Sequence, residues 1–503
     1  MKKWTIIIQI NAENNLIYDS ISVINEIGKA DSNDLVNYVV LFDGMPDPKF
    51  PKAPEHPAVY LVKKDTVYGE TEPDYVFTPD FDDLANPKIL AKALTWIKNQ
   101  YPSENYGFIY KGHGGAEGTD IVLGKIFTTK LMKKPAGTEE QIEEELTRLG
   151  GDLQDFEGYS EFDKNDNIIL AIYTNSNEGE YLSYKKLSET LVKVFGEKGL
   201  GFVGLDCCWG QQIEHAYSFK NATNYFVASV DEMTSLGLGY RDLAQYLNRR
   251  PTILPYELAS MFVAVNYVKN YADYDSEIPE FREMGVSLTA VDTIRLNNLV
   301  KLFNDICDRM IEKMNLHSAH ITKALECCMD YTYQMERSMY SVYNIDMVWF
   351  FENFLFFNKT DHKLNDMIMR FIHFHLLYYI RGYMGNNYKV IDPGSGKREL
   401  GGRGVSIAFP RTKEEFDDSI YSKKDKPDFA DDTHWIKMLK AYHKTLPPAP
   451  RKARALRPLT RSAGEEVVAE VIREKMHIGE DNCKWRNFKP AKKNLKEEPQ
   501  MSL

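Results

Sequence analysis

Two short motifs carry the side chains best suited to covalent chemistry. YGFIYKGHGGAEG (106–118) runs from apolar residues into a turn of small residues that contains His113, and GFVGLDCCWGQQIEHAY (201–217) does the same with two adjacent cysteines. A thiol becomes a nucleophile only as the thiolate, which needs a nearby base or a positive helix N-terminus. The imidazole of His113 and a helix beginning near Gln211 would supply both. The glycines after His113 would let a backbone N–H reach a substrate carbonyl, as in an oxyanion hole.

A parallel sheet would bring these two motifs together. The first half of the chain alternates β-rich runs with helical patterns, which is typical of an α/β sheet. The carboxyl ends of neighbouring parallel strands meet at one edge, so that His113 can face the adjacent cysteines. The predicted strands are Thr5–Ile10, Val36–Asp43, Ala58–Val62, Tyr106–Lys111, Phe202–Asp206 and Tyr225–Val230, and the predicted helices are Leu16–Gly28, Asn86–Gln100, Tyr184–Phe195 and Gln211–Phe219.

Changes in composition suggest the domain organisation. We predict an α/β domain over residues 1–248, interrupted at 118–166 by an exposed, charged insertion. Residues 249–445 indicate a helix-rich C-terminal subdomain, with a late strand at 404–410 that could rejoin the sheet. Residues 446–503 form a basic tail that we expect to be flexible. Further helices are predicted near 139–148, 294–314, 318–340, 346–358, 363–383 and 434–443.

Composition argues against several classes of protein and site. The chain has 62 Lys and Arg against 73 Asp and Glu, and the formal charge of −11 gives no reason to expect a nucleic-acid partner. Six cysteines among 503 residues are too few for a disulfide framework, and no C-x-x-C pair indicates structural zinc. No apolar run reaches the length of a membrane span or of a signal-peptide core. We expect a monomer that is cytoplasmic, or secreted if a leader has been removed.

An apolar block ending in His-Gly, followed by one ending in acid-small-Cys, resembles the caspase-like cysteine peptidases, and within them the clostripain family. The likeness covers roughly residues 4–443 in the same order, with the tail outside it. The segments that carry it are WTIIIQINAENNL, LDCCWGQQIEHAY, ASVDEM, VSIAFP and FADDTHWIKMLKAY. The resemblance implies a caspase-like, mostly parallel sheet flanked by helices, and a cysteine endopeptidase with a Cys-His dyad.

The resemblance also assigns catalytic roles. Cys208, the second residue after the acid, takes the position of the nucleophile, and Cys207 stands where the family has a small residue and is then a buried apolar side chain. His113 takes the position of the base. The N–H groups of Gly114 and Cys208 take the oxyanion position. Gly112 departs from the family, which commonly has Asn before the histidine.

The resemblance further implies the substrate. Asp206 matches an acid at the floor of the S1 pocket that selects Arg or Lys, and a buried guanidinium or ammonium does need a paired carboxylate. Ser229 and Asp231 lie on the loop that would line this pocket. The expected partners are therefore proteins or peptides with a basic P1 residue. Val230 stands where an acid is usual, which leaves the shape of S1 open.

Several alternatives accompany this interpretation. Family members cut themselves between the His and Cys strands, and we hypothesise self-cleavage in the insertion; a solvated loop of no special purpose is the alternative. The basic residues of the insertion at which such cleavage could occur include Lys125, Lys130, Lys133, Lys134 and Arg148. We predict no cofactor; calcium activates some relatives, but the chain has no EF-hand loop, and this dependence stays open. The alternative function is an inactive caspase-like protein that binds peptides or partner proteins in the same cleft.

The remaining histidines and cysteines have structural interpretations. The pairs His317/His320 and His373/His375 lack a third ligand at a telling spacing, so we expect them on a helix surface or in the core. The second cysteine pair, in ECCMD (326–330), has no His-Gly companion, and we expect it to serve in packing.

Overall fold

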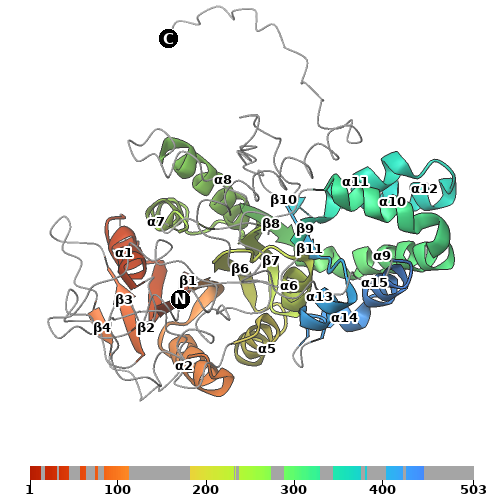
Figure 1. The fold of residues 1–503 in the computed structure, drawn as a ribbon. Helices are drawn as coiled ribbons and strands as arrows, with labels where there is room; N and C mark the ends of the chain where they lie inside the picture. Colours follow the sequence, from red (N-terminus) through yellow and green to blue (C-terminus); the bar gives the residue numbers. More distant parts are fainter. Residues whose placement is uncertain are drawn as a thin grey trace, which may run out of the picture. The chain divides into compact units, whose positions relative to one another are not determined.

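Figure 1 shows the computed structural model of the chain. It describes residues 1–12, 17–30, 33–44, 57–63, 74–76, 84–112, 182–230, 233, 237–273, 288–328, 344–374, 380–381, 404–422 and 426–446. These residues belong to one compact unit, Met1–Lys389 with Leu400–Pro447; a second unit, Val390–Glu399 with Pro448–Leu503, lies outside them. The predicted insertion at 118–166, the helix near 139–148 and the tail beyond Leu446 also lie outside the described residues.

A nine-stranded sheet forms the centre of the described unit, in the order β10-β8-β7-β6-β5-β1-β2-β3-β4. The central strands β7, β6, β5, β1 and β2 run parallel, and the others pair antiparallel. The bounds are β1 Lys2–Ala12, β2 Val36–Gly44, β3 Ala58–Val62, β4 Asp74–Val76, β5 Ser103–Lys111, β6 Leu200–Asp206, β7 Thr223–Ser229, β8 Leu288–Asp292 and β10 Ile380–Arg381. All six predicted strands are confirmed, and the sheet has a parallel centre as expected.

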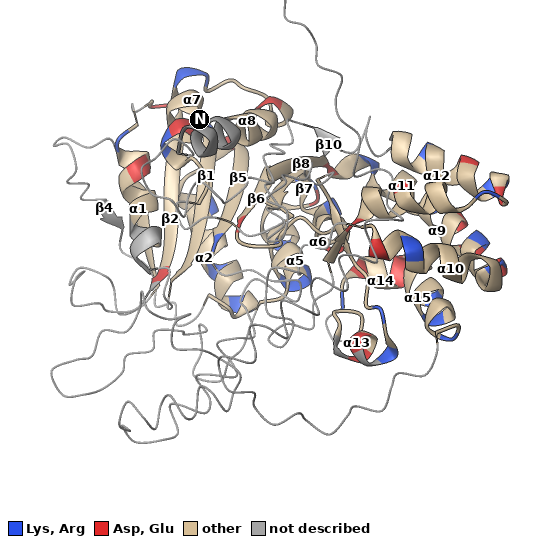
Figure 2. Ribbon diagram, turned by 45° about the horizontal axis from the view of Figure 1, so that its top comes forward, with Lys and Arg blue, Asp and Glu red and all other residues tan. Residues whose placement is uncertain are grey.

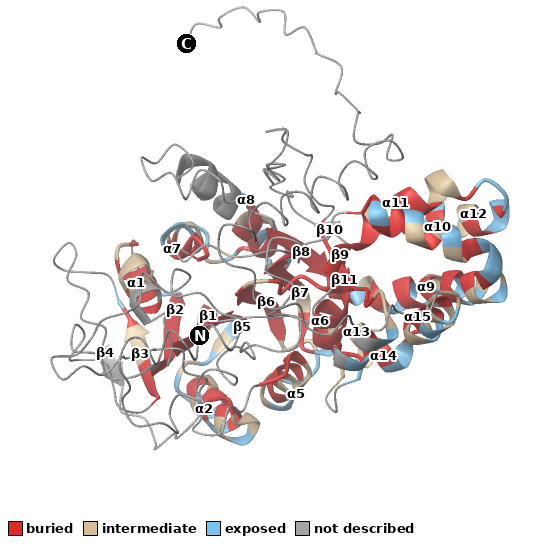
Figure 3. Ribbon diagram, in the orientation of Figure 1, coloured by how far each residue is buried: buried red, intermediate tan, exposed pale blue. Residues whose placement is uncertain are grey.

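Helices cover both faces of the sheet (Figure 1). One apolar core joins the sheet to α1 (Ile17–Gly28), α7 (Tyr240–Arg249) and α8 (Pro255–Asp273). A second core, on the other face, joins it to α2 (Pro87–Gln100), α5 (Tyr184–Phe195) and α6 (Ile213–Ser218). Figure 3 shows the strands largely buried, whereas the helices carry exposed residues on their outer sides. Figure 2 shows that the charged residues Lys, Arg, Asp and Glu lie mainly on the helices.

Alternation along β6 decides which side chains reach which face. Successive side chains of a strand point to opposite faces of the sheet. Val203, Leu205 and the following Cys207 belong to the core beneath α2, α5 and α6, whereas Phe202 belongs to the opposite core. Asp206 therefore lies on the face opposite to Cys207, toward α7.

Local sequence signals explain where α5 begins and ends. The Ser183 side chain accepts a hydrogen bond from the Lys186 N–H at 3.2 Å, which satisfies one of the free N–H groups of the first turn. Gly196 follows the last turn with φ of +87°, a conformation that favours glycine. Both signals can be read from the sequence, and the predicted bounds of this helix are confirmed.

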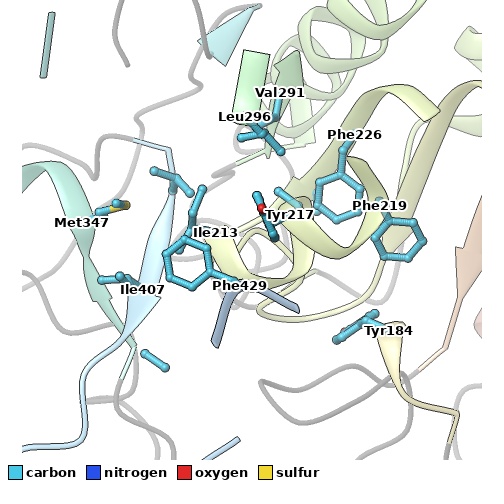
Figure 4. Close-up of a cluster of buried hydrophobic side chains, with 14 of the residues drawn as sticks. Tyr184, Ile213, Tyr217, Phe219, Phe226, Val291, Leu296, Met347, Ile407 and Phe429 are labelled. Carbon is cyan, nitrogen blue, oxygen red and sulfur yellow. The ribbon is translucent and has the colours of Figure 1, made fainter. Parts of the chain in front are cut away.

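The C-terminal helices extend the core beneath α5 and α6. They are α9 (Leu296–Glu312), α10 (Met314–Glu326), α11 (Met347–Phe357), α12 (His362–Phe374), α13 (Lys413–Asp418), α14 (Asp428–Asp432) and α15 (Trp435–His443). Phe303 of α9 packs against Phe351, Phe371 and Trp435, with ring centroids 5.4–6.2 Å apart. Figure 4 shows how side chains from the sheet and from these later segments share one apolar cluster.

The late strand differs from its expectation. β11 (Ser406–Ala408) does not rejoin the sheet but pairs antiparallel with β9 (Asn344–Asp346) in a separate two-stranded sheet. The predicted helices at 318–340 and 363–383 are shorter in the structure, since α10 ends at Glu326, α12 ends at Phe374 and β10 follows. β8 joins the central sheet from the C-terminal half of the chain. The domain boundary at 248 stays a prediction.

Candidate active site

β5 and β6 are neighbouring parallel strands, and each leads into one of the two motifs. Their register pairs Lys111 with Asp206, and the Gly112 N–H donates to the Asp206 carbonyl at 3.4 Å. His113 is the next residue after Gly112 in the sequence, and Cys208 follows Asp206 by two positions. The predicted adjacency of the two strands is confirmed. His113 and Gly114 themselves lie outside the described residues, and their roles stay predictions.

The structure separates the two adjacent thiols. Cys207 is 2% exposed, and its Sγ lies 3.5 Å from the Tyr184 hydroxyl within the apolar core. Cys207 is therefore the buried small side chain that was predicted. Cys208 is half-buried, whereas the other free thiols in the described residues, Cys207, Cys307 and Cys328, are buried. Among these four, only Cys208 can meet a substrate.

The surroundings of Cys208 favour the thiolate. The Met233 N–H donates a hydrogen bond to the Cys208 Sγ at 3.3 Å, and a donor aimed at sulfur stabilises its charged form. The next residue, Trp209, has φ of +51°, a left-handed conformation that a bulky residue rarely adopts. Such backbone outliers concentrate at functional sites. Trp209 and Val230 pack against Cys208 and form the side of the site next to the thiol.

The helix after the cysteines begins later than predicted. α6 starts at Ile213 and has six residues, so its N-terminus is separated from Cys208 by a turn and an extended segment. Gln211 lies in that segment: its carbonyl accepts the Ser406 N–H at 3.1 Å, and its N–H donates to Ser229 at 2.7 Å. These bonds hold the backbone extended where a helix was expected. The structure therefore does not support a helix-dipole contribution to the thiolate.

Glu214 of α6 ties the cysteine motif to the late strand. Its Oε1 accepts the Ala408 N–H at 3.0 Å and the Tyr421 hydroxyl, while Oε2 is buried and has no hydrogen-bond partner among the described residues. Burial raises the pKa of Glu214 to about 7, although these two hydrogen bonds favour the carboxylate. The sequence contains this glutamate within the motif, but its burial could not be inferred from neighbouring residues.

Asp206 has partners within the chain that the sequence analysis missed. Its Oδ2 accepts hydrogen bonds from the Lys111 Nζ at 3.2 Å, the Leu238 N–H at 3.2 Å and the Tyr240 hydroxyl at 2.8 Å. The Lys111 and Asp206 side chains are 4% and 1% exposed. Burial, followed by the Asp206 charge, raises the pKa of Tyr240 well above its usual value, so the phenol keeps the proton that it donates. The sequence did contain one signal for this pairing, because Lys111 stands at the end of an apolar strand.

The predicted lining of the S1 pocket is described only in part. Ser229 ends β7 and is fully buried, and its carbonyl accepts the Gln211 N–H. Val230 is buried beside Cys208 and Trp209, so the residue that replaces the usual acid contributes an apolar surface. Asp231 lies outside the described residues. The assignment of Ser229 and Asp231 to substrate binding stays a prediction.

The predicted packing role of the second cysteine pair is confirmed for Cys328 alone. Cys327 and Cys328 are both buried, and the Cys328 Sγ lies 3.2 Å from the Asp346 carbonyl. Cys327 is disulfide-bonded.

Of the histidines of the helical region, His317 and His320 have structural contacts, and His375 lies outside the described residues. His317 is buried, with its Nε2 3.3 Å from an oxygen of Asp361, and His320 packs against Phe354. His373 is exposed on α12. The described part of the chain contains no cluster of three or more His, Cys, Asp or Glu that could hold a metal ion. Within that same part, no helix is long and apolar enough to cross a membrane.

Comparison with known proteins agrees with this fold. A secreted C11 cysteine protease from Bacteroides thetaiotaomicron, solved in complex with an irreversible peptide inhibitor, is 14% identical; the match covers 86% of this chain and 100% of that chain, with a TM-score of 0.52. Another structure of a secreted C11 cysteine protease from the same organism, named iotapain, is 13% identical; this match covers 88% and 99%, with a TM-score of 0.52. No curated protein sequence matches significantly.

The sequence also matches the model of a protein family. The model described as the clostripain family covers residues 158–442, which is more than half of the chain. The caspase-like sheet together with this match defines a cysteine protease, a hydrolase of peptide bonds. Within that class, the chain belongs to the clostripain family.

Proposed function

We propose that the protein is an endopeptidase in which Cys208 is the nucleophile and His113 the general acid and base. The Cys208 Sγ attacks the scissile carbonyl carbon, the C–N bond breaks, and a thioester forms while His113 passes the thiol proton to the leaving amine. His113 then takes a proton from water, whose oxygen attacks the thioester and releases the thiolate. The N–H groups of Gly114 and Cys208 stabilise the oxyanion in both steps.

One observation carries this proposal: Cys208 is the half-buried thiol at the end of β6, directly beside the strand that leads to His113. The Met233 N–H supports it, because a hydrogen bond to sulfur lowers the energy of the thiolate. The alternative is an inactive protein that binds peptides in the same cleft. It would leave the Cys208 thiol without a catalytic role. None of the described residues around Cys208 favours that alternative.

The test compares the two adjacent cysteines. Fluorescein-labelled casein presents many cleavage sites, so it reports turnover whatever the P1 preference. We expect Cys208→Ala and His113→Ala to lower turnover by about a thousandfold or more, because the covalent step is lost. Cys207→Ala is the matched control and should retain most of the activity, since it only shortens a core side chain. Turnover that survives in Cys208→Ala, or that disappears in Cys207→Ala alone, would refute the assignment.

Two finer properties follow from the resemblance and stay predictions. Cleavage after Arg or Lys would use Asp206, Ser229 and Asp231; the position of Asp206 two residues before the nucleophile supports this, and its pairing with Lys111 argues against it. Self-cleavage would fall in the segment 118–166. Intact-mass measurement during incubation tests it, with Cys208→Ala as the control, and an active protein that keeps its full mass contradicts it.

A further inference from the structure

His215 has a buried imidazole that the proposed mechanism does not use. Resting on the proposed peptidase activity of Cys208, we propose that His215 is a positioning residue for the nucleophile. It holds the turn that follows Cys208 in a strained conformation, and this conformation sets the direction of the thiol. The effect passes through the carbonyl of Gly210, two residues after Cys208, and not through the reacting atoms.

One hydrogen bond joins His215 to this turn. The Nδ1 of His215 lies 3.2 Å from the Gly210 carbonyl oxygen. A carbonyl oxygen can only accept, so the imidazole carries a proton on Nδ1 and donates it. Both residues are buried, and His215 is only 3% exposed. Water cannot easily replace a donor that a buried carbonyl loses, so this bond constrains the turn more strongly than an exposed one would.

The ring of Tyr184 holds the imidazole in place. Tyr184 is the first residue of α5, and the centroid of its ring lies 4.0 Å from that of His215, with an interplanar angle of 43°. Tyr184 is itself buried, and its ring also contacts that of Phe219. A buried side chain in such close contact has few alternative rotamers, because protein interiors are closely packed. The Nδ1 donor of His215 therefore points in a fixed direction.

The backbone of Gly210 is held against the sheet at the same time. A Cβ added at Gly210 would lie 3.1 Å from the Ala228 Cβ, so the backbone there rests directly on β7. The N–H of the next residue, Gln211, donates to the Ser229 carbonyl at 2.7 Å. Gly210 is thus fixed by the sheet and by the hydrogen bond from His215, and the end of the turn cannot shift freely.

Trp209 is the residue that needs this support. Its φ of +51° lies in the left-handed region, which a residue with a bulky side chain adopts only where its neighbours enforce it. If the turn relaxed, rotation about the Trp209 backbone would reorient the preceding peptide and with it the Cys208 side chain. The Cys208 Sγ would then leave the Met233 N–H, which now donates to it at 3.3 Å. Loss of the donor on His215 is therefore expected to reach the thiol.

The experiment compares two variants of similar shape, His215→Asn and His215→Leu. Both remove the ring, but only Asn can donate to Gly210, because its side-chain nitrogen is attached to Cγ as the Nδ1 of histidine is. Alkylation by iodoacetamide, followed at Cys208 by peptide mapping, measures the reactivity of the thiol. Hydrolysis of labelled casein gives kcat and KM. We expect His215→Asn to exceed His215→Leu by about tenfold or more in alkylation rate and in kcat, with similar KM values.

A merely structural role of His215 predicts the opposite order. Leu suits a buried position better than Asn does, so stability alone would favour His215→Leu. Urea unfolding identifies conditions in which both variants are folded, and both rates are measured there. His317→Leu is the matched control, because it removes another buried imidazole, on α10, and should leave both rates at the wild-type level.

The outcomes distinguish this inference from the proposed function. Equal rates in the two variants, or faster rates in His215→Leu, overturn the positioning role of His215. In that case turnover abolished by Cys208→Ala leaves the proposed peptidase intact. Casein turnover that survives in Cys208→Ala instead overturns the proposed function, whereas the alkylation rates still report whether His215 acts on the Cys208 thiol.

Discussion

Glu214 should make the stability of the protein fall as the pH rises. It is fully buried on α6, and burial raises its pKa from 4.5 to about 7. The unfolded chain then releases the proton at a lower pH than the folded chain does. Between these two pKa values the folded state binds more protons, so deprotonation favours unfolding as the pH increases.

The magnitude follows from the size of the shift. One pKa unit corresponds to about 1.4 kcal/mol, so ionised Glu214 would reduce the free energy of unfolding by about 3 kcal/mol at high pH. About 2 kcal/mol of this should be lost between pH 5 and pH 7, and little more above pH 8. Glu214→Gln keeps an acceptor for Ala408 and Tyr421 but cannot ionise, so it should lack this part of the pH dependence.

Urea unfolding followed by circular dichroism measures the effect. Both proteins should carry Cys208→Ala, so that self-cleavage cannot interfere. Other groups titrate in the same range, so the decisive quantity is the difference between the two proteins. We expect Glu214→Gln to gain about 2 kcal/mol relative to Glu214 between pH 5 and pH 7. If the free energy of unfolding changes equally with pH in both proteins over this range, Glu214 is not a neutral, buried carboxyl.

Two further predictions concern stability. Gly237→Ala should lower the free energy of unfolding by about 2–3 kcal/mol, because its Cβ would collide with the Asp206 carboxylate, whereas Gly196→Ala, with φ of +87° but open space around it, should cost only about 1 kcal/mol. Equal losses in urea unfolding would contradict the steric argument. Burial alone would raise the pKa of Asp361, but the hydrogen bonds from Arg309 and the Leu364 N–H, together with the charges of Arg309 and Lys313, outweigh it and hold the pKa at about 2. Asp361→Asn should therefore destabilise the protein by about 2 kcal/mol at neutral pH, with less effect as the pH falls from about 4 to about 2; a loss that does not depend on pH would exclude this charge interaction.

Much of the fold could be predicted because its signals are local. Apolar runs marked all six predicted strands, and Ser183 and Gly196 marked the two ends of α5. The distinction between Cys207 and Cys208 was also predictable, from the resemblance to the family and from the alternation of side chains along β6. These features depend on residues a few positions apart, whose periodicity the sequence displays directly.

Other features depended on contacts between distant segments. β11 was a candidate for the central sheet, yet it pairs with β9. Its Ser406 holds Gln211 in an extended conformation that delays the start of α6. Periodicity cannot indicate which edge a short strand will join, because several edges offer equivalent backbone partners. The burial of Glu214 has the same origin, since its hydrogen-bond partners lie about two hundred residues further along the chain.

The sequence by itself therefore determined the strand-end motifs and the family, and it supplied the candidates for the reacting side chains. The tertiary structure alone decided the environment of those side chains, above all the pairing of Asp206 with a lysine 95 residues earlier in the chain. The physical reason is that the register of two parallel strands is set by packing across the whole sheet. That register placed Lys111 opposite Asp206 and made this acid half of a buried ion pair.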